Sequence, residues 1–252
     1  MGSLENCHEQ LRRILGSEIE PFEVLQIADQ HRRFWRPEKV RTILLAESHV
    51  YTSGEEAALK VELPANISSS APKSFVRLVY CLAYGENGLL KKTITNPKNS
   101  GTRQFWEVFY SCVNQVTCNE DFSAVHKTRT RDLCQRIQNK FQLLQELQQK
   151  GIWLVDGSLA ALYMPGRDKL GPEIMQQALQ VSWDSYVGEQ VVQAKPEQII
   201  CIGTGVQRSL ESRLQKAFLS PIPITTVKQP NARMSRCERF QTFKTYFEIC
   251  NK

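Results

Sequence analysis

Residues 41–51 decide the fold, and they read RTILLAESHVY. A strand is predicted at Arg41–Glu47, because its uncharged centre is short and apolar, as in strands that are buried on both faces of a sheet. Similar apolar runs follow at 152–155, 198–202 and 224–227, with helical patterns between them. Strands that alternate with helices form parallel sheets covered on both faces. We therefore expect an α/β three-layer sandwich with a central, mostly parallel, four-stranded sheet flanked by helices.

Helical spacing of apolar residues predicts the elements around these strands. Two helices come first, at 4–15 and 22–34, within an N-terminal helical extension at about 1–37. Later helices are expected at 102–115, 128–150, about 172–194, 206–217 and 235–249. A long polar connection is predicted at 52–73. The apolar segment 75–84 suits a strand but is also compatible with a helix.

Length and composition are those of an ordinary globular protein. The 252 residues fit one domain of this class, so a single α/β domain is expected over residues 1–252. Hydrophobic residues make up 41% of the chain and charged residues 23%. No apolar run is long enough to cross a bilayer, and the N-terminus lacks the features of a secretion signal. We therefore expect no membrane partner and a cytoplasmic location, or a nuclear one in a eukaryote.

Cysteine spacing and net charge narrow the function classes. The eight cysteines form no Cys-x-x-Cys pair and no Cys/His spacing of a zinc site. We expect reduced thiols and no metal site. The net charge of +6 fits either a solvated basic surface or a polyanion partner, and leans toward the partner.

The loops that follow the four strands are the expected site. Ligands of parallel α/β sheets bind outside the carboxyl ends of the strands. Polar residues stand at each of these ends, which are 47–51, 156–158, 203–205 and 229–233. These segments are far apart in sequence, but a parallel sheet would bring them to one edge.

Several of these segments, in this order, resemble the uracil-DNA glycosylase superfamily over about residues 40–250. The segment 43–51 resembles the strand and loop that carry the family's water-activating residue, and GTRQFW at 101–106 resembles the Asn-Arg-Phe-Trp segment of the mismatch-specific branch. GIWLVD at 151–156 resembles the strand that ends in the base-reading Asn. The strand 198–203 closes on Gly as in the family, and QPN at 229–231 stands where the family has His-Pro-Ser or Met-Pro-Ser.

This resemblance implies a DNA-repair function. The partner would be DNA with a damaged or mismatched base, and the reaction would be base excision by hydrolysis of an N-glycosidic bond. No cofactor is implied, because the family's chemistry uses a positioned water and preorganised electrostatics. We expect a monomer.

The catalytic candidates are Glu47, Ser48 and His49. Ser48 stands where the family has Asp or Asn, and a serine hydroxyl is no base at neutral pH. A shift of one residue in the match would place Glu47 or His49 there instead. Glu47 is the better candidate to orient the water and His49 the second. The alternatives are a solvated loop carboxylate for Glu47 and a satisfied polar loop residue for His49.

The base-binding candidates are Tyr51, Phe105 and Asp156. Either aromatic ring could stack on a flipped base, although Phe105 could equally be a core residue, and Trp106 and Phe109 are expected in the core. Asp156 replaces the family's Asn. An ionised carboxylate only accepts hydrogen bonds, so Asp156 would favour an amino-bearing or protonated base over uracil. The alternative is that Asp156 caps a helix that begins at residue 157.

The DNA-binding candidates are Gln229, Pro230, Asn231 and Arg233. Gln229 could donate its amide to the departing base, Asn231 could hold a phosphate, and Arg233 could enter the minor groove. The alternative is a hydrated turn. Two other functions stay open: a non-catalytic nucleic-acid-binding protein on a glycosylase-like fold, and an unrelated α/β enzyme that acts on a nucleotide or nucleoside.

Overall fold

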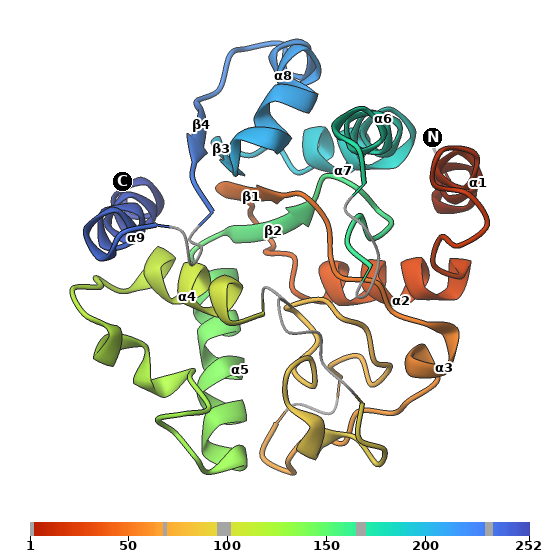
Figure 1. Ribbon diagram of the computed structural model, residues 1–252. Helices are drawn as coiled ribbons and strands as arrows, with labels where there is room; N and C mark the ends of the chain where they lie inside the picture. Colours follow the sequence, from red (N-terminus) through yellow and green to blue (C-terminus); the bar gives the residue numbers. More distant parts are fainter. Residues whose placement is uncertain (1–2, 68–69, 95–101, 165–169, 230–233) are drawn as a thin grey trace.

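A parallel sheet forms the centre of the molecule, as Figure 1 shows. The computed structural model describes residues 3–67, 70–94, 102–164, 170–229 and 234–252. All strand pairs in this sheet are parallel, and their order is β2-β1-β3-β4. The strands are β1 Thr42–Ala46, β2 Ile152–Asp156, β3 Gln198–Ile202 and β4 Ile224–Val227. The expectation of an α/β protein with a parallel sheet is confirmed.

The central position of β1 explains its sequence. Leu44 pairs with Leu154 of β2 on one side and with Ile200 of β3 on the other. All five residues of β1 are buried, which is why the strand shows an unbroken apolar run rather than an alternating one. The carboxyl ends of β1, β2 and β3 therefore meet at one edge of the sheet.

Helices cover both faces of the sheet (Figure 1). On one side lie α6 and α8, and α6 also contacts α1. On the other side lie α4 and α5, and α4 packs along α9. This arrangement is compatible with a three-layer sandwich. The helices are α1 Leu4–Leu15, α2 Phe22–Phe34, α3 Gly54–Ala57, α4 Thr102–Val113, α5 Leu133–Gln149, α6 Pro172–Ser182, α7 Gly188–Gln193, α8 Thr204–Ala217 and α9 Arg236–Cys250.

Two predicted helices differ from the observed ones for local reasons. α5 begins five residues later than expected, because Asp132 caps it by accepting a 2.6 Å hydrogen bond from the backbone N–H of Gln135. The helix expected at about 172–194 is divided by a π-helical turn at Trp183–Val187. A Cβ at Gly188 would lie 2.8 Å from the Trp183 carbonyl oxygen, so glycine at this position allows the backbone to pass close to Trp183.

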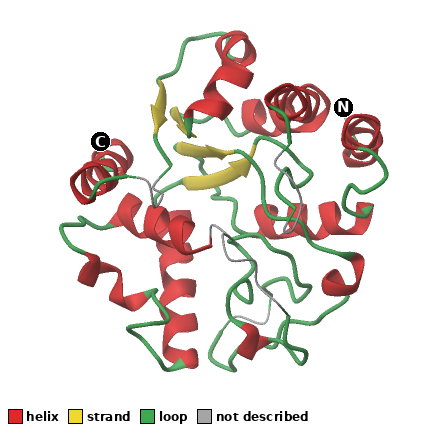
Figure 2. Ribbon diagram, in the orientation of Figure 1, coloured by secondary structure: helices red, strands yellow, loops and turns green. Residues whose placement is uncertain are grey.

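The segment 75–84 forms neither a strand nor a helix, although all ten of its residues are buried. Figure 2 shows this part of the chain as loop. Its backbone groups bond at short range, with the N–H of Cys81 donating to Leu78 and that of Tyr84 donating to Cys81. Both predictions for this segment are wrong, because an apolar run reports burial and not backbone conformation.

The N-terminal helices share the core of the sheet. Leu11 of α1 and Leu25 of α2 are fully buried in the same apolar cluster as Ile43 of β1. All eight cysteines are free thiols. No helix in the described part of the chain is long and apolar enough to span a bilayer.

Candidate functional site at the carboxyl edge of the sheet

A pocket of about 710 Å³ lies at the carboxyl ends of β1, β3 and β4. Glu47 follows β1 directly, Gly203 follows β3, and Gln229 follows β4 by two residues. Residues of α6 also line the pocket, the apolar Met175 and Leu179 together with the polar Gln176. The pocket thus combines a few polar groups with an apolar wall, as ligand sites of this size usually do.

The start of α8 shapes the floor of this pocket. Gly203 has a φ of 95°, which residues with a side chain rarely adopt, so the chain can turn sharply from β3 into the helix. A Cβ at Gly205 would lie 4.0 Å from Glu47 Oε2, so the carboxylate lies over the first turn of α8. The amino end of a helix carries partial positive charge, which favours an anion at this point.

Gln229 connects the pocket to α4. Its Nε2 donates a 3.3 Å hydrogen bond to Oε1 of Gln104 on that helix. The other predicted DNA-binding residues, Pro230, Asn231 and Arg233, lie outside the described residues. Of the predicted catalytic residues, Glu47 is the one that lines this pocket.

Four other predicted residues meet at a much smaller cavity, of about 20 Å³. Ser48, His49, Phe105 and Asp156 all line it. This volume admits about one water molecule and no nucleobase. Tyr51 lies elsewhere, at a shallow pocket of about 70 Å³ beside Leu15 and Ile19 of the N-terminal segment. Within the described residues, Tyr51 and Asp156 therefore line different cavities, and the cavity that Phe105 shares with Asp156 is too small for a base.

Asp156 and His49 belong to a buried ionic network with Glu20 and Arg32. Arg32 Nη2 lies 2.6 Å from Asp156 Oδ2, and His49 Nδ1 lies 3.5 Å from the same oxygen. On its other side, His49 Nε2 lies 3.0 Å from Glu20 Oε2. None of the four side chains is more than 4% exposed. These charges contact one another rather than solvent.

The network fixes the protonation states of its members. Burial lowers the pKa of His49, but the carboxylates of Glu20 and Asp156 outweigh burial and raise the pKa to about 9. Burial raises the pKa of Asp156, but the nearby Arg32 guanidinium outweighs it and holds the pKa below its usual value. At neutral pH His49 is therefore a cation with no lone pair for a proton. Such a group is poorly suited to activate water.

Glu20 also ties two loops together. Its Oε1 accepts a 2.7 Å hydrogen bond from the N–H of Thr52, and its Oε2 accepts a 2.9 Å bond from the N–H of Ala161. The loops after β1 and β2 are thus held by one buried carboxylate. The alternative that Asp156 caps a helix is wrong, because residues 157–164 contain no helix.

Ser48 has a structural role between the same two loops. Its hydroxyl donates a 3.0 Å hydrogen bond to the carbonyl oxygen of His49 and accepts one of 3.0 Å from the N–H of Leu162. Trp106 and Phe109 are core residues as expected, at 2% and 0% exposure. Phe105 is half-buried and packs against the core at the small cavity.

Sequence reasoning missed Glu20 and Arg32, the two network members that precede the first strand. The signal for Arg32 was present, because it follows Leu25 and Ala28 at helical spacing on the buried face of α2. A charged residue at a core position needs a buried partner. No comparable signal marks Glu20, which lies in the short connection before α2.

Comparison with known proteins assigns this sequence to no family. No protein-family model matches this sequence, and no curated protein matches it significantly. Within the described residues, no group of three or more His, Cys, Asp or Glu side chains is arranged to hold a metal ion. The function is therefore argued from the geometry of the pocket at Glu47.

Proposed function

We propose that this protein recognises a base in DNA and hydrolyses its N-glycosidic bond, with Glu47 as the catalytic carboxylate. The observation that carries the proposal is the place of Glu47 at the carboxyl edge of a parallel sheet, in a pocket of about 710 Å³. Pockets of this volume hold ligands of nucleotide size. The resemblance of the strand-end segments to uracil-DNA glycosylases supplies the substrate class.

The residues of the pocket have the chemistry that this reaction needs. Glu47 would orient a water and take a proton as the water oxygen adds to C1′ of the sugar. The bond from C1′ to the base nitrogen breaks, and its electron pair leaves with the base. The carboxamide of Gln229, which also lines the pocket, would donate a hydrogen bond to the departing base.

A strand-cleavage assay after alkali treatment tests the proposal. The substrates are labelled duplexes with uracil, hypoxanthine, xanthine or a thymine–guanine mismatch. We expect cleavage of at least one of them, and a loss of about 100-fold or more in Glu47→Gln, which keeps the shape of the side chain and removes its basicity. The matched control is Glu211→Gln on the exposed side of α8, which should cleave like the unaltered protein.

Full activity in Glu47→Gln would contradict the role of Glu47. An absence of cleavage on every substrate would instead support the second candidate, a non-catalytic nucleic-acid-binding protein. One observation favours that candidate: Ser48 and Asp156, at the family's catalytic and base-reading positions, are held in structural contacts. It predicts DNA binding whose affinity falls steeply with salt, with no excision.

A further inference from the structure

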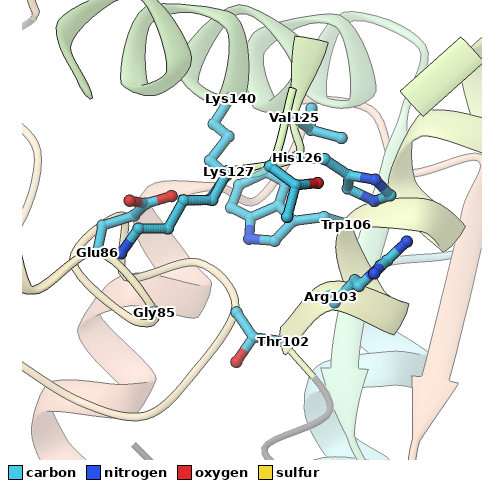
Figure 3. Close-up of a pocket in the computed structure, with 10 residues that line it drawn as sticks. Gly85, Glu86, Thr102, Arg103, Trp106, Val125, His126, Lys127 and Lys140 are labelled. Carbon is cyan, nitrogen blue, oxygen red and sulfur yellow. The ribbon is translucent and has the colours of Figure 1, made fainter. Parts of the chain in front are cut away.

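A second cavity, of about 280 Å³, lies between the amino end of α4, the helix α5 and the turn at 125–128. It shares no lining residue with the pocket at Glu47. Figure 3 shows its floor, where Trp106 lies between Glu86 and Lys140 on one side and His126 and Arg103 on the other. Nothing in the proposed base chemistry uses this cavity.

On one side of the cavity, the lining residue Glu86 binds two cations, of which Lys140 also lines the cavity. Lys140 Nζ lies 2.7 Å from Glu86 Oε1, and Arg136 donates to both Glu86 oxygens at 2.8 and 2.6 Å. All three side chains are at most 5% exposed. Burial raises the pKa of Glu86, but Arg136 and Lys140 outweigh it, so the carboxyl stays ionised. Arg136 also interacts with Asp132 and donates to backbone carbonyl oxygens, so Lys140 is the cation of this group that lines the cavity.

The other side repeats this pattern around Glu107. Arg103 Nε and Arg239 Nη2 each lie 3.1 Å from Glu107 Oε1, and His126 Nε2 lies 3.3 Å from it. Lys127 is exposed on the rim, and it has no ion-pair partner within the described ranges. Among the residues that line the cavity, Arg103, Lys127 and Lys140 are cations and Glu86 is a carboxylate, so cations exceed carboxylates there.

The floor contributes a hydrogen-bond donor that has no acceptor. The Trp106 side chain is almost fully buried, and its Nε1–H has no hydrogen-bond partner among the described residues. Figure 3 shows this nitrogen on the edge of the ring that faces Thr102. Lys140 Nζ lies 4.9 Å from the centroid of the same ring. A buried donor of this kind normally has a partner, and here a bound acceptor would supply it.

The amino end of α4 adds the field of a helix. The helix runs for 12 residues from Thr102, and Thr102 and Arg103 both line the cavity. The first amides of a helix have no acceptor within the helix and carry partial positive charge. Such an end binds anions that present several oxygens, above all phosphate.

We propose that this cavity is a binding site for a phosphate group. A phosphate carries up to two negative charges and several acceptor oxygens, which fits the surplus of cations, the helix end and the free indole N–H. A carboxylate would neutralise less of the charge and offer fewer acceptors. The phosphate can belong to inorganic phosphate, to a mononucleotide or to the backbone of a nucleic acid. The proposal does not depend on the activity of Glu47.

The test is a titration with inorganic phosphate, followed on the indole N–H resonance of Trp106. This resonance is identified by its loss in Trp106→Phe. We expect a saturable shift with phosphate and none with chloride at equal ionic strength. Affinity should fall about tenfold in Lys127→Ala and in Arg103→Ala, because each removes a cation from the cavity. Both side chains are solvent-exposed, so these variants should fold.

Lys216→Ala is the matched control, because Lys216 is an exposed cation on α8, outside the cavity. An unchanged resonance under phosphate, or an equal response to chloride, would overturn the proposal. So would equal affinity of Lys127→Ala, Arg103→Ala and Lys216→Ala. Nucleoside 5′-monophosphate and a short oligodeoxynucleotide are titrated in parallel, and the tightest of the three probes identifies the source of the phosphate. Glu47→Gln should bind phosphate normally, which separates this site from the proposed excision.

Discussion

Glu47 and His49 stand two residues apart in one loop, yet they belong to opposite kinds of site. Glu47 lines a pocket of about 710 Å³, whereas His49 lies in the buried ionic network beside a cavity of about 20 Å³. Both regions are built from the loops that follow the strands. The carboxyl edge of this sheet therefore combines two features: buried charges that hold its loops together, and an open pocket beside Glu47.

The difference comes from desolvation. A charge without water is stable only where partners replace the water, so each member of the network is fixed by the others. Removing one partner leaves the rest unbalanced. Glu47, by contrast, is only half-buried and lines a pocket of about 710 Å³. We expect substitutions in the network to affect stability and substitutions in the pocket to affect binding or catalysis.

The largest effect is expected for Asp156→Ala. This change leaves the cations Arg32 and His49 buried without their shared carboxylate. The free energy of unfolding should fall by about 3–5 kcal/mol, as measured by urea denaturation at pH 7. The control is Asp184→Ala, which breaks the exposed pair with Arg213 and should cost less than about 1 kcal/mol. Equal losses in the two variants would show that the network adds no more than a surface ion pair.

The next largest effect is a pH dependence of the free energy of unfolding that comes from His49 in the buried network. The pKa of His49 is raised from 6.5 to about 9 in the folded protein, because Glu20 and Asp156 favour the imidazolium against burial. The contribution of His49 to the free energy of unfolding is complete below pH 6.5. It is lost as the pH rises toward 9, because the unfolded chain releases the His49 proton at a lower pH than the folded protein does. This pKa shift corresponds to a change of about 3 kcal/mol in the free energy of unfolding.

Urea denaturation at several pH values from 6 to 9 measures this loss. The comparison is with His49→Gln, which carries no titrating group at this position, so the contributions of other groups cancel in the difference. His31 adds a pH dependence of its own near pH 6, because burial lowers its folded pKa to about 4 whereas the unfolded chain titrates near 6.5, but this contribution is present in both proteins and cancels in the difference. If the difference in stability between the two proteins stays constant with pH, His49 is not held as a cation.

The contrast between the two regions also shows which features of the structure can be predicted from the sequence. All four strands were predicted within a few residues of their observed ends, because burial on both faces produces an unbroken apolar run. Residues 75–84 were not, because the same kind of apolar run is buried there in turns. Apolar pattern locates the core, and it defines backbone conformation only where length and flanking residues agree.

In the candidate site, the sequence predicted where the polar residues lie in the fold, but it did not predict which side chains surround them. Glu47 lines an open pocket at the expected edge, since its place follows from the end of a strand. The burial of Asp156 depends on Arg32, which is 124 residues away in sequence. No local pattern around Asp156 distinguishes an acceptor that reads a base from one that holds a guanidinium. The same holds for His49, whose charge depends on Glu20 in the connection before α2.

The smallest effect is expected for Ser48→Ala, which lies between the two regions in sequence. The change removes the acceptor of the Leu162 N–H and the donor to the His49 carbonyl oxygen, so it should cost about 1 kcal/mol of unfolding free energy. Ser209→Ala in the wall of the pocket is the matched control, and it should cost less than about 0.5 kcal/mol. If Glu47 is the catalytic carboxylate, excision by Ser48→Ala should equal that of the unaltered protein. A loss of excision comparable to that of Glu47→Gln would instead place Ser48 among the reacting groups. The catalytic part of the loop would then include Ser48, and the structural network would begin at His49.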